Sequence, residues 1–575
     1  MASEPIRSPL NILFIYGSSV LFFLFVAILC ASTGFLFGIP ITSYHFLLSV
    51  FITLFFIWVS CSLFSYRTKP FDFLIVLFLL TLSFYLFFEI GRSFFDISDD
   101  GQGYHQEALI QLSRGWNPFS HLLDASEANR LDRWLNHYSK GVWFYEAILF
   151  RFSQDLEAAK LFHLWLMTAA FSITLSSLSR FAVLPVWVAF LASLLAAFNP
   201  VSIYQSLSFY LDGQLMSLMV ILLAILGMIF HGPSRHYHYF LLFMVLSVLV
   251  NVKLTAGIYG MMILAGYVGL LWWAKQMGRL RKVVMVAAAS LIFGFFFFGY
   301  SPYVTNTLHR GNPFYPALGT DRSDYTLPQF PRNFYGKSSP HLLFYSIFSK
   351  SDNKRGLEKK AHLKIPFTVA GDELKAFQDT NAKQGGFGPL FGGTILVSFL
   401  IIGGALGYFA VRSRVEKSSI SRHALLVLFC MGILLATCLI NPASSLARFI
   451  PQMWLFPIFT VFLCYIFNNR VARMISPFIL LLLALNNGLV AYAYFKYNSE
   501  ITEVYNQRLG KMASERIEDP HKIYFGYYQT GNTWRFDRLG INYQVVADKE
   551  ACKQGVRILP NSILMKCDSH DRSTI

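Results

Sequence analysis

The stretch FFDISDDGQGYHQEALIQLSRGWNPF (Phe94–Phe119) follows an apolar run, Phe71–Ile90, that is long enough to cross a lipid bilayer. It begins with three carboxylates, Asp96, Asp99 and Asp100. Acids at the point where a chain leaves a membrane can be solvated, yet they border a low-dielectric region that focuses their charge. The same residues would also suit a polar loop in which Asp99 or Asp100 caps a surface helix. The remainder of the chain has to separate a functional site from a helix cap.

The composition is that of a polytopic helical membrane protein. Of the 575 residues, 55% are hydrophobic, 17% are aromatic and only 14% are charged, whereas a soluble domain needs more polar surface. The formal net charge of +16 does not indicate a nucleic-acid partner, because the basic residues are spread over short links between apolar runs. Membrane lipids with anionic head groups, or a lipid substrate that carries phosphate, are the partners that this charge predicts.

Apolar runs of spanning length recur along the chain. We expect about 13 membrane spans, at residues 11–38, 44–65, 71–90, 159–179, 182–198, 212–231, 239–256, 257–274, 283–301, 389–411, 423–440, 450–468 and 475–495. The links rich in lysine and arginine then fall on one side, which the positive-inside rule identifies as the cytoplasm. The N-terminus is expected on that side and the C-terminus outside. Arg7 precedes an apolar run with no convincing cleavage site, so we expect a retained first span rather than a signal peptide.

This topology predicts three parts: N-terminal spans (1–70), a main membrane region (71–495) and an extracytoplasmic tail (496–575). Two long loops of the main region, 91–158 and 302–388, face outward and are expected to form the catalytic surface. The basic stretch Lys350–Lys364 suits either a solvated loop or a lid. The tail has strand-like runs between turn signals, which predicts a small α/β unit. An extracytoplasmic compartment favours a disulfide between its two cysteines, Cys552 and Cys567.

Further polar features accompany the acidic loop on the outer face. They are a second Asp-Gly-Gln unit that begins at Asp212, a lysine within an apolar region (Lys253), RGNPFYP with Arg310 and Tyr315, and ARFIPQMWL with Arg448 and Gln452. A cation at the membrane border is costly unless it snorkels or pairs, and arginine suits a phosphate through its forked donors. Each feature alone could be a helix cap or a membrane anchor. Three cations that face the same compartment as two carboxylate sites favour one active site.

These residue types suit the transfer of a sugar. An acceptor hydroxyl needs a base, and Asp100 can remove its proton during attack. A lipid-phosphate leaving group gathers negative charge, which Lys253, Arg310 or Arg448 can stabilise. Aromatic and polar side chains near these charges are candidates for binding the substrates: Tyr104, His105, Gln106, Trp116, Trp143, Tyr315 and Gln452. A single displacement assisted by Asp100 would invert the anomeric configuration.

The quoted motifs resemble those of the GT-C superfamily of integral membrane glycosyltransferases, in particular bacterial members similar to the dolichyl-phosphate-mannose–protein mannosyltransferases. Such enzymes carry one acidic motif in the first large extracytoplasmic loop and a second in a later outer loop, and SDDGQGYHQ and YLDGQ would be these motifs here. VKLTAG, RGNPFYP, GGFGPLF and ARFIPQMWL look like motifs of uncharacterised bacterial members. Over roughly residues 70–495 the resemblance implies an all-α membrane fold in the bacterial inner membrane. It also implies a polyprenyl-phosphate sugar donor and a glycan, lipid or protein acceptor.

Several points stay open at this stage. About two extra spans precede the acidic loop, which in this family usually follows the first span. The tandem Asp99-Asp100 leaves two candidates for the base, and Asp100 is favoured because it belongs to the repeated Asp-Gly-Gln unit. No compact metal-ligand spacing appears, and the family includes members with and without a divalent cation. The identities of the sugar and of the acceptor are not encoded in any motif.

Two other classes of protein remain as alternatives. A polysaccharide polymerase or O-antigen ligase would share the lipid carrier and the outer-face arginines, but it would depend less on an acidic first loop. A transporter of lipid-linked glycans should show internal repeats and polar residues near mid-membrane, and neither is clear in this sequence.

Overall fold

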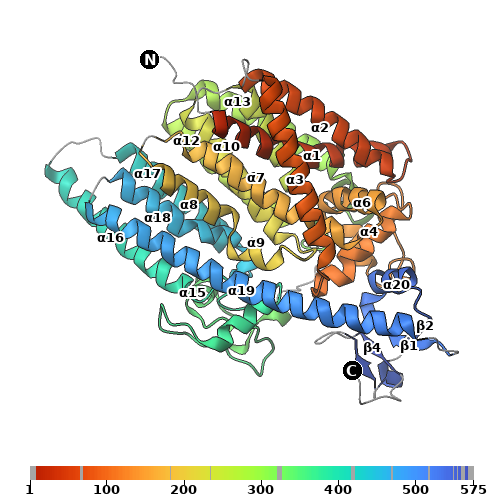
Figure 1. The fold of residues 1–575 in the computed structure, drawn as a ribbon. Helices are drawn as coiled ribbons and strands as arrows, with labels where there is room; N and C mark the ends of the chain where they lie inside the picture. The colour runs from red at the N-terminus through yellow and green to blue at the C-terminus, as the bar shows by residue number, and fades with distance from the viewer. Residues whose placement is uncertain are drawn as a thin grey trace.

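A computed structural model describes residues 8–64, 69–181, 183–232, 235–319, 327–415, 421–467, 470–515, 519–547, 549–552, 555–558 and 564–567. The chain is a mostly helical, multi-span membrane protein (Figure 1). Within the described ranges, eight helices are long and apolar enough to cross a membrane. Five shorter apolar helices lie at the positions of the remaining expected spans. Each expected span therefore corresponds to an apolar helix.

The long candidate spans include α1 (Ser8–Leu36), α2 (Ser43–Phe64), α3 (Lys69–Ser93), α7 (Leu161–Leu178), α10 (Asp212–His231), α12 (Leu254–Trp273), α13 (Met277–Phe293) and α19 (Arg470–Ser514). The shorter apolar helices are α8 (Val186–Ala197), α11 (His236–Val250), α16 (Phe391–Val415), α17 (Ser421–Leu439) and α18 (Leu455–Ile466). In their most apolar segments, α1 and α10 each bury 83% of the residues, against 11% for α3. A helix that is apolar all round either packs inside the bundle or faces lipid. Helices α1 and α10 are therefore central, and α3 is peripheral.

The connecting segments fold into shorter helices. These are α4 (Gln106–Ser113), α5 (Asp132–His137), α6 (Gly141–Ser153), α9 (Pro200–Gln205), α14 (Thr305–Arg310), α15 (Ser339–Phe348) and α20 (Gln529–Arg538). Single 3-10 or π turns are η1 (Gly101–His105), η2 (Glu157–Lys160), η3 (Gly294–Phe298), η4 (Tyr300–Val304), η5 (Leu327–Gln329), η6 (Arg332–Phe334), η7 (Gly371–Gln378), η8 (Ala447–Phe449), η9 (Pro451–Trp454), η10 (Gly526–Tyr528) and η11 (Lys549–Cys552). Pro200 stands at the start of α9, and the Asn199 side chain caps that helix by accepting a hydrogen bond from the Ser202 amide.

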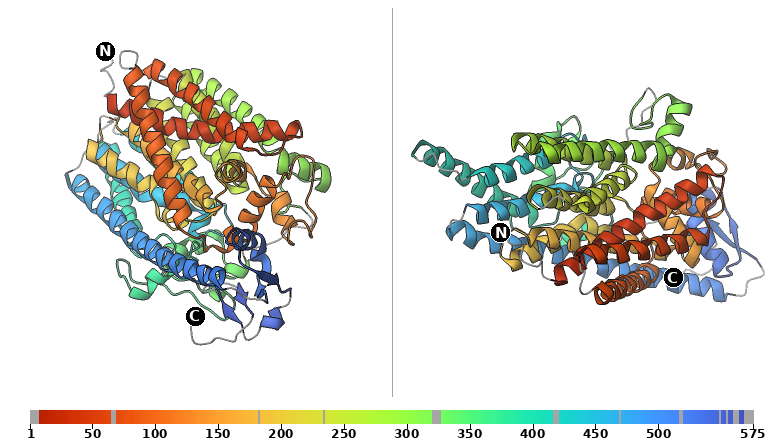
Figure 2. Two further views of the ribbon diagram at one scale, coloured as in Figure 1. Left: turned by 45° about the vertical axis from the view of Figure 1, so that its right-hand side comes forward. Right: turned by 90° about the horizontal axis from the view of Figure 1, so that it is seen from above.

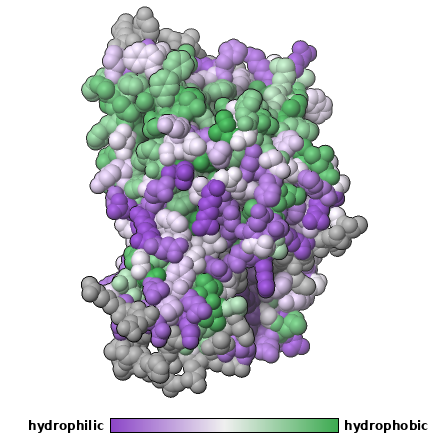
Figure 3. Space-filling model, turned by 90° about the vertical axis from the view of Figure 1, so that its right-hand side faces the viewer, coloured by the Kyte–Doolittle hydropathy of each residue, from purple (hydrophilic) through white to green (hydrophobic). Residues whose placement is uncertain are grey.

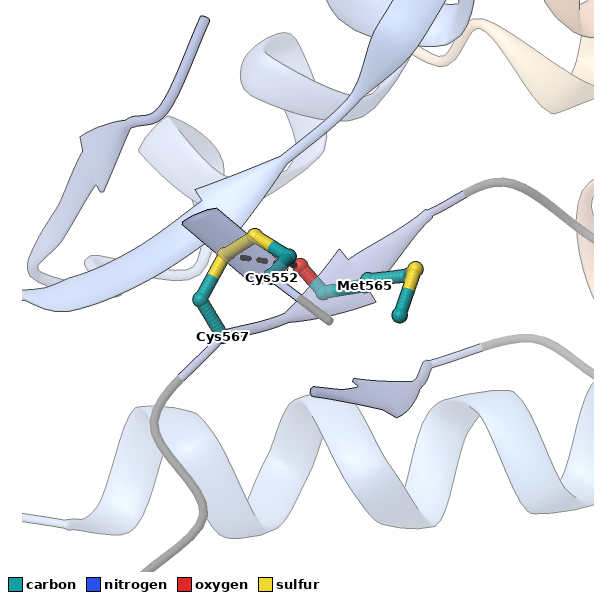
Figure 4. The surroundings of a disulfide bond; sticks show 3 residues. All are labelled: Cys552, Met565 and Cys567. Atoms are coloured by element: carbon teal, nitrogen blue, oxygen red, sulfur yellow. Dashed lines mark hydrogen bonds between the residues drawn. A yellow bond between two sulfur atoms is a disulfide. The ribbon is translucent and has the colours of Figure 1, made fainter. Parts of the chain in front are cut away.

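The tail is a small α/β unit at the end of the last span. Its sheet has the strand order β2-β1-β4-β3, with β1 (His521–Tyr524) parallel to β2 (Tyr543–Val545) and antiparallel to β4 (Met565–Lys566). Strand β3 (Val556–Arg557) pairs antiparallel with β4. A disulfide joins Cys552 to Cys567 beside these strands (Figure 4).

Helix α19 connects the membrane region to the tail without a break. It is 45 residues long, so the boundary expected at residue 495 falls within it. Both views in Figure 2 show the C-terminal strands beside the far end of this helix. There Tyr505 and Leu509 pack with Ile523, Phe525 and Phe536 in a separate hydrophobic cluster.

The surface divides along the axis of the bundle. In Figure 3, hydrophobic residues gather in the upper part of the visible face, and hydrophilic residues cover much of the lower part. Large apolar side chains of α2 and α3, such as Phe51, Phe55 and Phe78, are exposed. This distribution fits a bilayer around the helices, with the loops and the tail in water at one end.

Candidate active site

The acidic loop is anchored by its first carboxylate. Asp96 is buried, and its two oxygens accept hydrogen bonds from the backbone amides of Ser98 at 2.8 Å and Phe209 at 3.2 Å. Burial raises the pKa of Asp96 to about 6, although the nearby Lys160 acts in the opposite direction. Asp96 therefore ties the loop to the segment before Asp212 and has no free face for a substrate.

Gly101 lies against this anchor, which gives a first prediction. A methyl group on its Cα would overlap the Asp96 carboxylate and the Ser98 hydroxyl, whose oxygen also accepts a bond from the Gly101 amide at 3.1 Å. Asp96 cannot withdraw without losing its own two hydrogen bonds. Gly101→Ala should therefore displace the loop and lower the rate of any reaction that depends on it by about 100-fold, as expected when reacting groups are misplaced by about an ångström.

The matched control for Gly101→Ala is Gly269→Ala. Gly269 lies within α12, where an added methyl would meet no atom of the described structure within 4 Å. Melting curves and activity of both purified variants would be compared with the unaltered protein. An active Gly101→Ala variant with an unchanged melting temperature would show that the loop tolerates the displacement.

Four charged side chains from separate segments meet beside this loop. A guanidinium nitrogen of Arg448 lies 3.2 Å from an oxygen of Asp100 and 3.9 Å from an oxygen of Asp212. The Lys253 ammonium lies 2.7 Å from the other Asp212 oxygen. The Asp212 side chain is only 2% exposed, whereas that of Asp100 is 32% exposed. The buried Asp212 therefore holds the side chains of Lys253 and Arg448 in place. Asp100 is the carboxylate that a substrate can reach.

The charges near Asp100 decide its protonation. Burial alone would raise the pKa of Asp100, but the charge and the hydrogen bond of Arg448 hold this pKa below its usual value. Burial lowers the pKa of the neighbouring His105 to about 3. The Nδ1 atom of His105 accepts a hydrogen bond from the Trp143 indole at 2.7 Å, which places the proton of the neutral ring on Nε2. At neutral pH the site thus contains an ionised Asp100 and an uncharged His105.

Aromatic rings enclose the cations. The guanidinium carbon of Arg448 lies 4.9 Å from the ring centre of Tyr210 and 4.6 Å from that of Phe449, and the Lys253 ammonium lies 4.6 Å from the same Phe449 ring. Burial and the charge of Asp100 raise the pKa of both Tyr210 and Tyr104 well above the usual value. Both phenols therefore keep their protons and can donate to an anionic or hydroxyl group.

The tandem acids point to different partners. The side chain of Asp99 belongs to an exposed residue and accepts a hydrogen bond at 2.5 Å from the hydroxyl of Tyr528, which lies in the tail. Asp100 instead pairs with Arg448. Of the two adjacent acids, Asp100 therefore belongs to the cluster of four charges, and Asp99 is bound to the tail.

Several other candidates have partners within the protein itself. Trp116 is buried and its indole donates to the His121 carbonyl at 3.0 Å. The buried Gln452 donates to the Thr437 hydroxyl at 3.1 Å. The side-chain oxygen of Gln106 accepts a hydrogen bond from Arg535 of the tail at 3.2 Å. Each of these three side chains thus forms a hydrogen bond with a group of the protein itself, outside the cluster of four charges.

Arg310 and Tyr315 form a separate pair. Arg310 is exposed, and its guanidinium carbon lies 5.1 Å from the ring centre of Tyr315. The Tyr315 ring also meets His137 edge-on at 4.7 Å. Within the part of the chain that the structure describes, neither residue forms a hydrogen bond, an ion pair or a ring contact with Asp100 or Arg448. The structure does not bring them into the cluster.

Two residues that the sequence did not single out lie where the long second loop meets the site. They are Gln205 of α9 and Lys383 of the loop. Gln205 donates to Asp212 at 3.4 Å and to the carbonyl of Thr380 at 3.3 Å, and thereby joins this loop to the site. Lys383 is buried and donates to Gln329 at 2.5 Å. Burial and the charge of Arg448 lower the pKa of Lys383 to about 8. A hint lay in the sequence, because Lys383 stands two residues before Gly385, where the GGFGPLF motif begins.

The described residues hold no group of three or more histidine, cysteine, aspartate or glutamate side chains that could bind a metal ion.

Comparison with known proteins gives a similarity to solved structures alone. No family model and no curated protein matches the chain. Among solved structures, the fold is similar to that of ArnT from Cupriavidus metallidurans, whose crystal structure contains undecaprenyl phosphate. The similarity covers 83% of this chain and 86% of ArnT, with 12% sequence identity and a TM-score of 0.43. Similarity of this degree assigns neither a family nor an activity.

Proposed function

We propose that this protein transfers a sugar from a polyprenyl-phosphate donor to an acceptor hydroxyl at the extracytoplasmic end of the membrane. The observation that carries the proposal is the convergence of Asp100, Asp212, Lys253 and Arg448 beside the loop. An accessible, ionised carboxylate beside two cations combines a base with a phosphate-binding site. Such a site at the end of apolar helices suits a substrate whose lipid chain stays in the membrane while its phosphate reaches water.

The cations have donors for a phosphate. The Nε atom of Arg448 is buried and, among the described residues, has no hydrogen-bond partner. The Lys253 ammonium donates one hydrogen bond to Asp212, and its side chain is partly exposed. A phosphate that accepts hydrogen bonds from both groups would gain negative charge as its bond to the sugar breaks. The two cations would stabilise that charge, and stabilisation of the leaving group at this stage lowers the barrier.

The proposed reaction is a single displacement. An Asp100 oxygen takes the proton of the acceptor hydroxyl as the acceptor oxygen attacks the anomeric carbon. The bond from that carbon to the phosphate oxygen breaks, and its electron pair leaves with the polyprenyl phosphate. Attack from the face opposite the leaving group inverts the anomeric configuration. Asp212 has no part in proton transfer in this proposal; it holds Lys253 and Arg448 in place.

The position of the disulfide supports an extracytoplasmic site. Disulfides persist outside the cytoplasm, and the tail that contains Cys552 and Cys567 contacts Asp99 through Tyr528. The site and the disulfide therefore lie at the same end of the molecule. With the positive-inside rule, this supports a cytoplasmic N-terminus and a periplasmic C-terminus in a bacterial inner membrane.

The proposed activity can be tested with purified protein in liposomes. A panel of polyprenyl-phosphate sugars, radiolabelled in the sugar, would be mixed with acceptors of glycan, lipid and protein type. We expect one donor to lose its sugar, with release of polyprenyl phosphate and a product of inverted configuration. Repeated addition of glycan units would identify a polymerase instead. Movement of an intact lipid-linked sugar between leaflets, without cleavage of any donor, would identify a transporter.

A further inference from the structure

The C-terminal unit, defined here as the described residues from 519 to 567, is docked on the acidic loop. The Tyr528 hydroxyl donates to Asp99 at 2.5 Å. The Arg535 guanidinium donates to Gln106 at 3.2 Å and forms an ion pair with Glu157. These contacts join the C-terminal unit to the loop that carries the proposed base, although the two lie about 400 residues apart in the chain.

The contact is buried and charged. Tyr528 and Arg535 are both buried, and the guanidinium carbon of Arg535 lies 4.5 Å from the ring centre of Phe95. Glu157 also pairs with the buried Lys160 at 2.6 Å, so one carboxylate is shared by two cations. Removal of one partner of a buried pair leaves an uncompensated charge, which makes such a contact hard to open. The C-terminal unit is thus a fixed part of this end of the molecule.

Helix α19 holds the beginning of the same loop. The Phe95 amide donates to the Thr502 hydroxyl at 3.0 Å, and the Phe95 ring lies 4.0 Å from the ring of Tyr505. The next residue, Asp96, is held by hydrogen bonds from the backbone amides of Ser98 and of Phe209, and Phe209 belongs to the membrane region. Between Asp96 and Gln106, the Tyr528 hydroxyl connects the tail to an acidic side chain of the loop, that of Asp99. The orientation of the tandem acids therefore depends on this hydroxyl.

We infer that Tyr528 is a positioning residue of the active site, which holds Asp99 so that Asp100 faces Arg448. Adjacent carboxylates on one turn compete for the same cation, and Arg448 approaches Asp100 at 3.2 Å while Tyr528 engages Asp99. Without the Tyr528 hydroxyl, Asp99 would lose its partner and the loop could turn either acid toward Arg448. The kinetic consequence of this inference rests on the proposed function, whereas its effect on the loop does not.

The test is Tyr528→Phe, which removes one hydroxyl and keeps the ring. We expect kcat to fall by about 10-fold, because a hydrogen bond to a charged group is lost, while the KM for the lipid donor stays near that of the unaltered protein. Tyr543→Phe is the matched control, since the Tyr543 hydroxyl donates to Asp537 at 2.9 Å within the C-terminal unit. This control should have unchanged kcat. Asp99→Ala should give a similar loss, and the double variant with Tyr528→Phe should add no further loss.

Hydrogen exchange of the backbone amides supplies a readout that needs no activity. Residues 97–106 should exchange faster in Tyr528→Phe than in Tyr543→Phe, with no donor present. Unchanged exchange and unchanged kcat in Tyr528→Phe, in a protein that is otherwise active, would overturn the inference. Equal losses from Tyr528→Phe and Tyr543→Phe would also overturn it, because they would indicate general damage to the C-terminal unit. If the unaltered protein transfers no sugar, the proposed function fails, and the exchange measurement still decides whether Tyr528 holds the loop.

Discussion

Asp100→Asn is expected to lower kcat by about 1,000-fold, the contribution of a well-placed general base. The asparagine oxygen can still accept the hydrogen bond that Arg448 gives to Asp100, so the fold and the binding of polyprenyl phosphate should persist. The amide cannot take a proton from the acceptor hydroxyl. Initial rates with saturating donor, and the melting temperature in detergent, would separate loss of chemistry from loss of structure.

Asp99→Asn is the control for this substitution. It changes the neighbouring acid, and its oxygen can still accept the hydrogen bond from Tyr528. The loss of rate should be far smaller than for Asp100→Asn. An inactive Asp99→Asn beside an active Asp100→Asn would reverse the assignment of the base, and full activity of both would exclude base catalysis by either acid.

The pH profile of the unaltered protein tests the same assignment. A base works in its deprotonated form, so its rate is lost as the pH falls through its pKa. Because Arg448 holds the pKa of Asp100 below its usual value, that form should persist down to about pH 4, near the ordinary pKa of aspartate. If Asp100 alone governs kcat, kcat should stay level between neutral pH and about pH 5. An acid limb centred near neutrality would indicate a different base.

The positions of the membrane helices could be predicted from sequence because long apolar runs have few alternative structures. The meeting of Asp100, Asp212, Lys253 and Arg448 followed in part from topology. Spans that alternate in direction return their polar ends to one small surface, where charges of opposite sign attract. The sequence therefore indicated the shared face, although the distances had to come from the structure.

The hydrogen-bond partners of individual side chains in the site could not be predicted from hydropathy or motif patterns. Gln106 and Gln452 stand within the candidate motifs, yet a motif does not show whether a polar side chain faces a substrate or its own scaffold. Tyr528 is recognised only after the tail is placed on the loop. Tertiary contacts of loops depend on packing between distant segments, and no local period records them.

The end of α19 was obscured for a different reason. Hydropathy falls near residue 495, which marks where the helix leaves the apolar zone and not where the helix ends. Beyond that point Ile501, Tyr505, Leu509 and Met512 recur at helical spacing and pack on the tail. The sequence predicts a helical start to the tail, but a change from an apolar to an amphipathic pattern does not show that this segment continues the last span as one helix.

Arg448→Met is expected to lower kcat/KM by about 100-fold or more, the usual effect of removing a group that stabilises developing negative charge. The substitution removes the cation between Asp100 and Asp212 and keeps a long side chain against Tyr210 and Phe449. The pKa of Asp100 should also rise, because burial then acts without the opposing charge of Arg448. The acid limb of the pH profile should accordingly move to higher pH, which loss of packing alone would not produce.

Two further variants decide whether this effect belongs to the position or to positive charge in general. Arg448→Lys keeps the charge but lacks the further guanidinium donors, such as the Nε atom proposed to bind phosphate, so it should restore only part of the rate. Arg310→Met removes an exposed arginine that lies over Tyr315, and it should change kcat/KM little. An inactive Arg310→Met with an active Arg448→Met would instead place the phosphate beside Tyr315. That result would separate the phosphate from Asp100, and a direct displacement with Asp100 as base would no longer be possible.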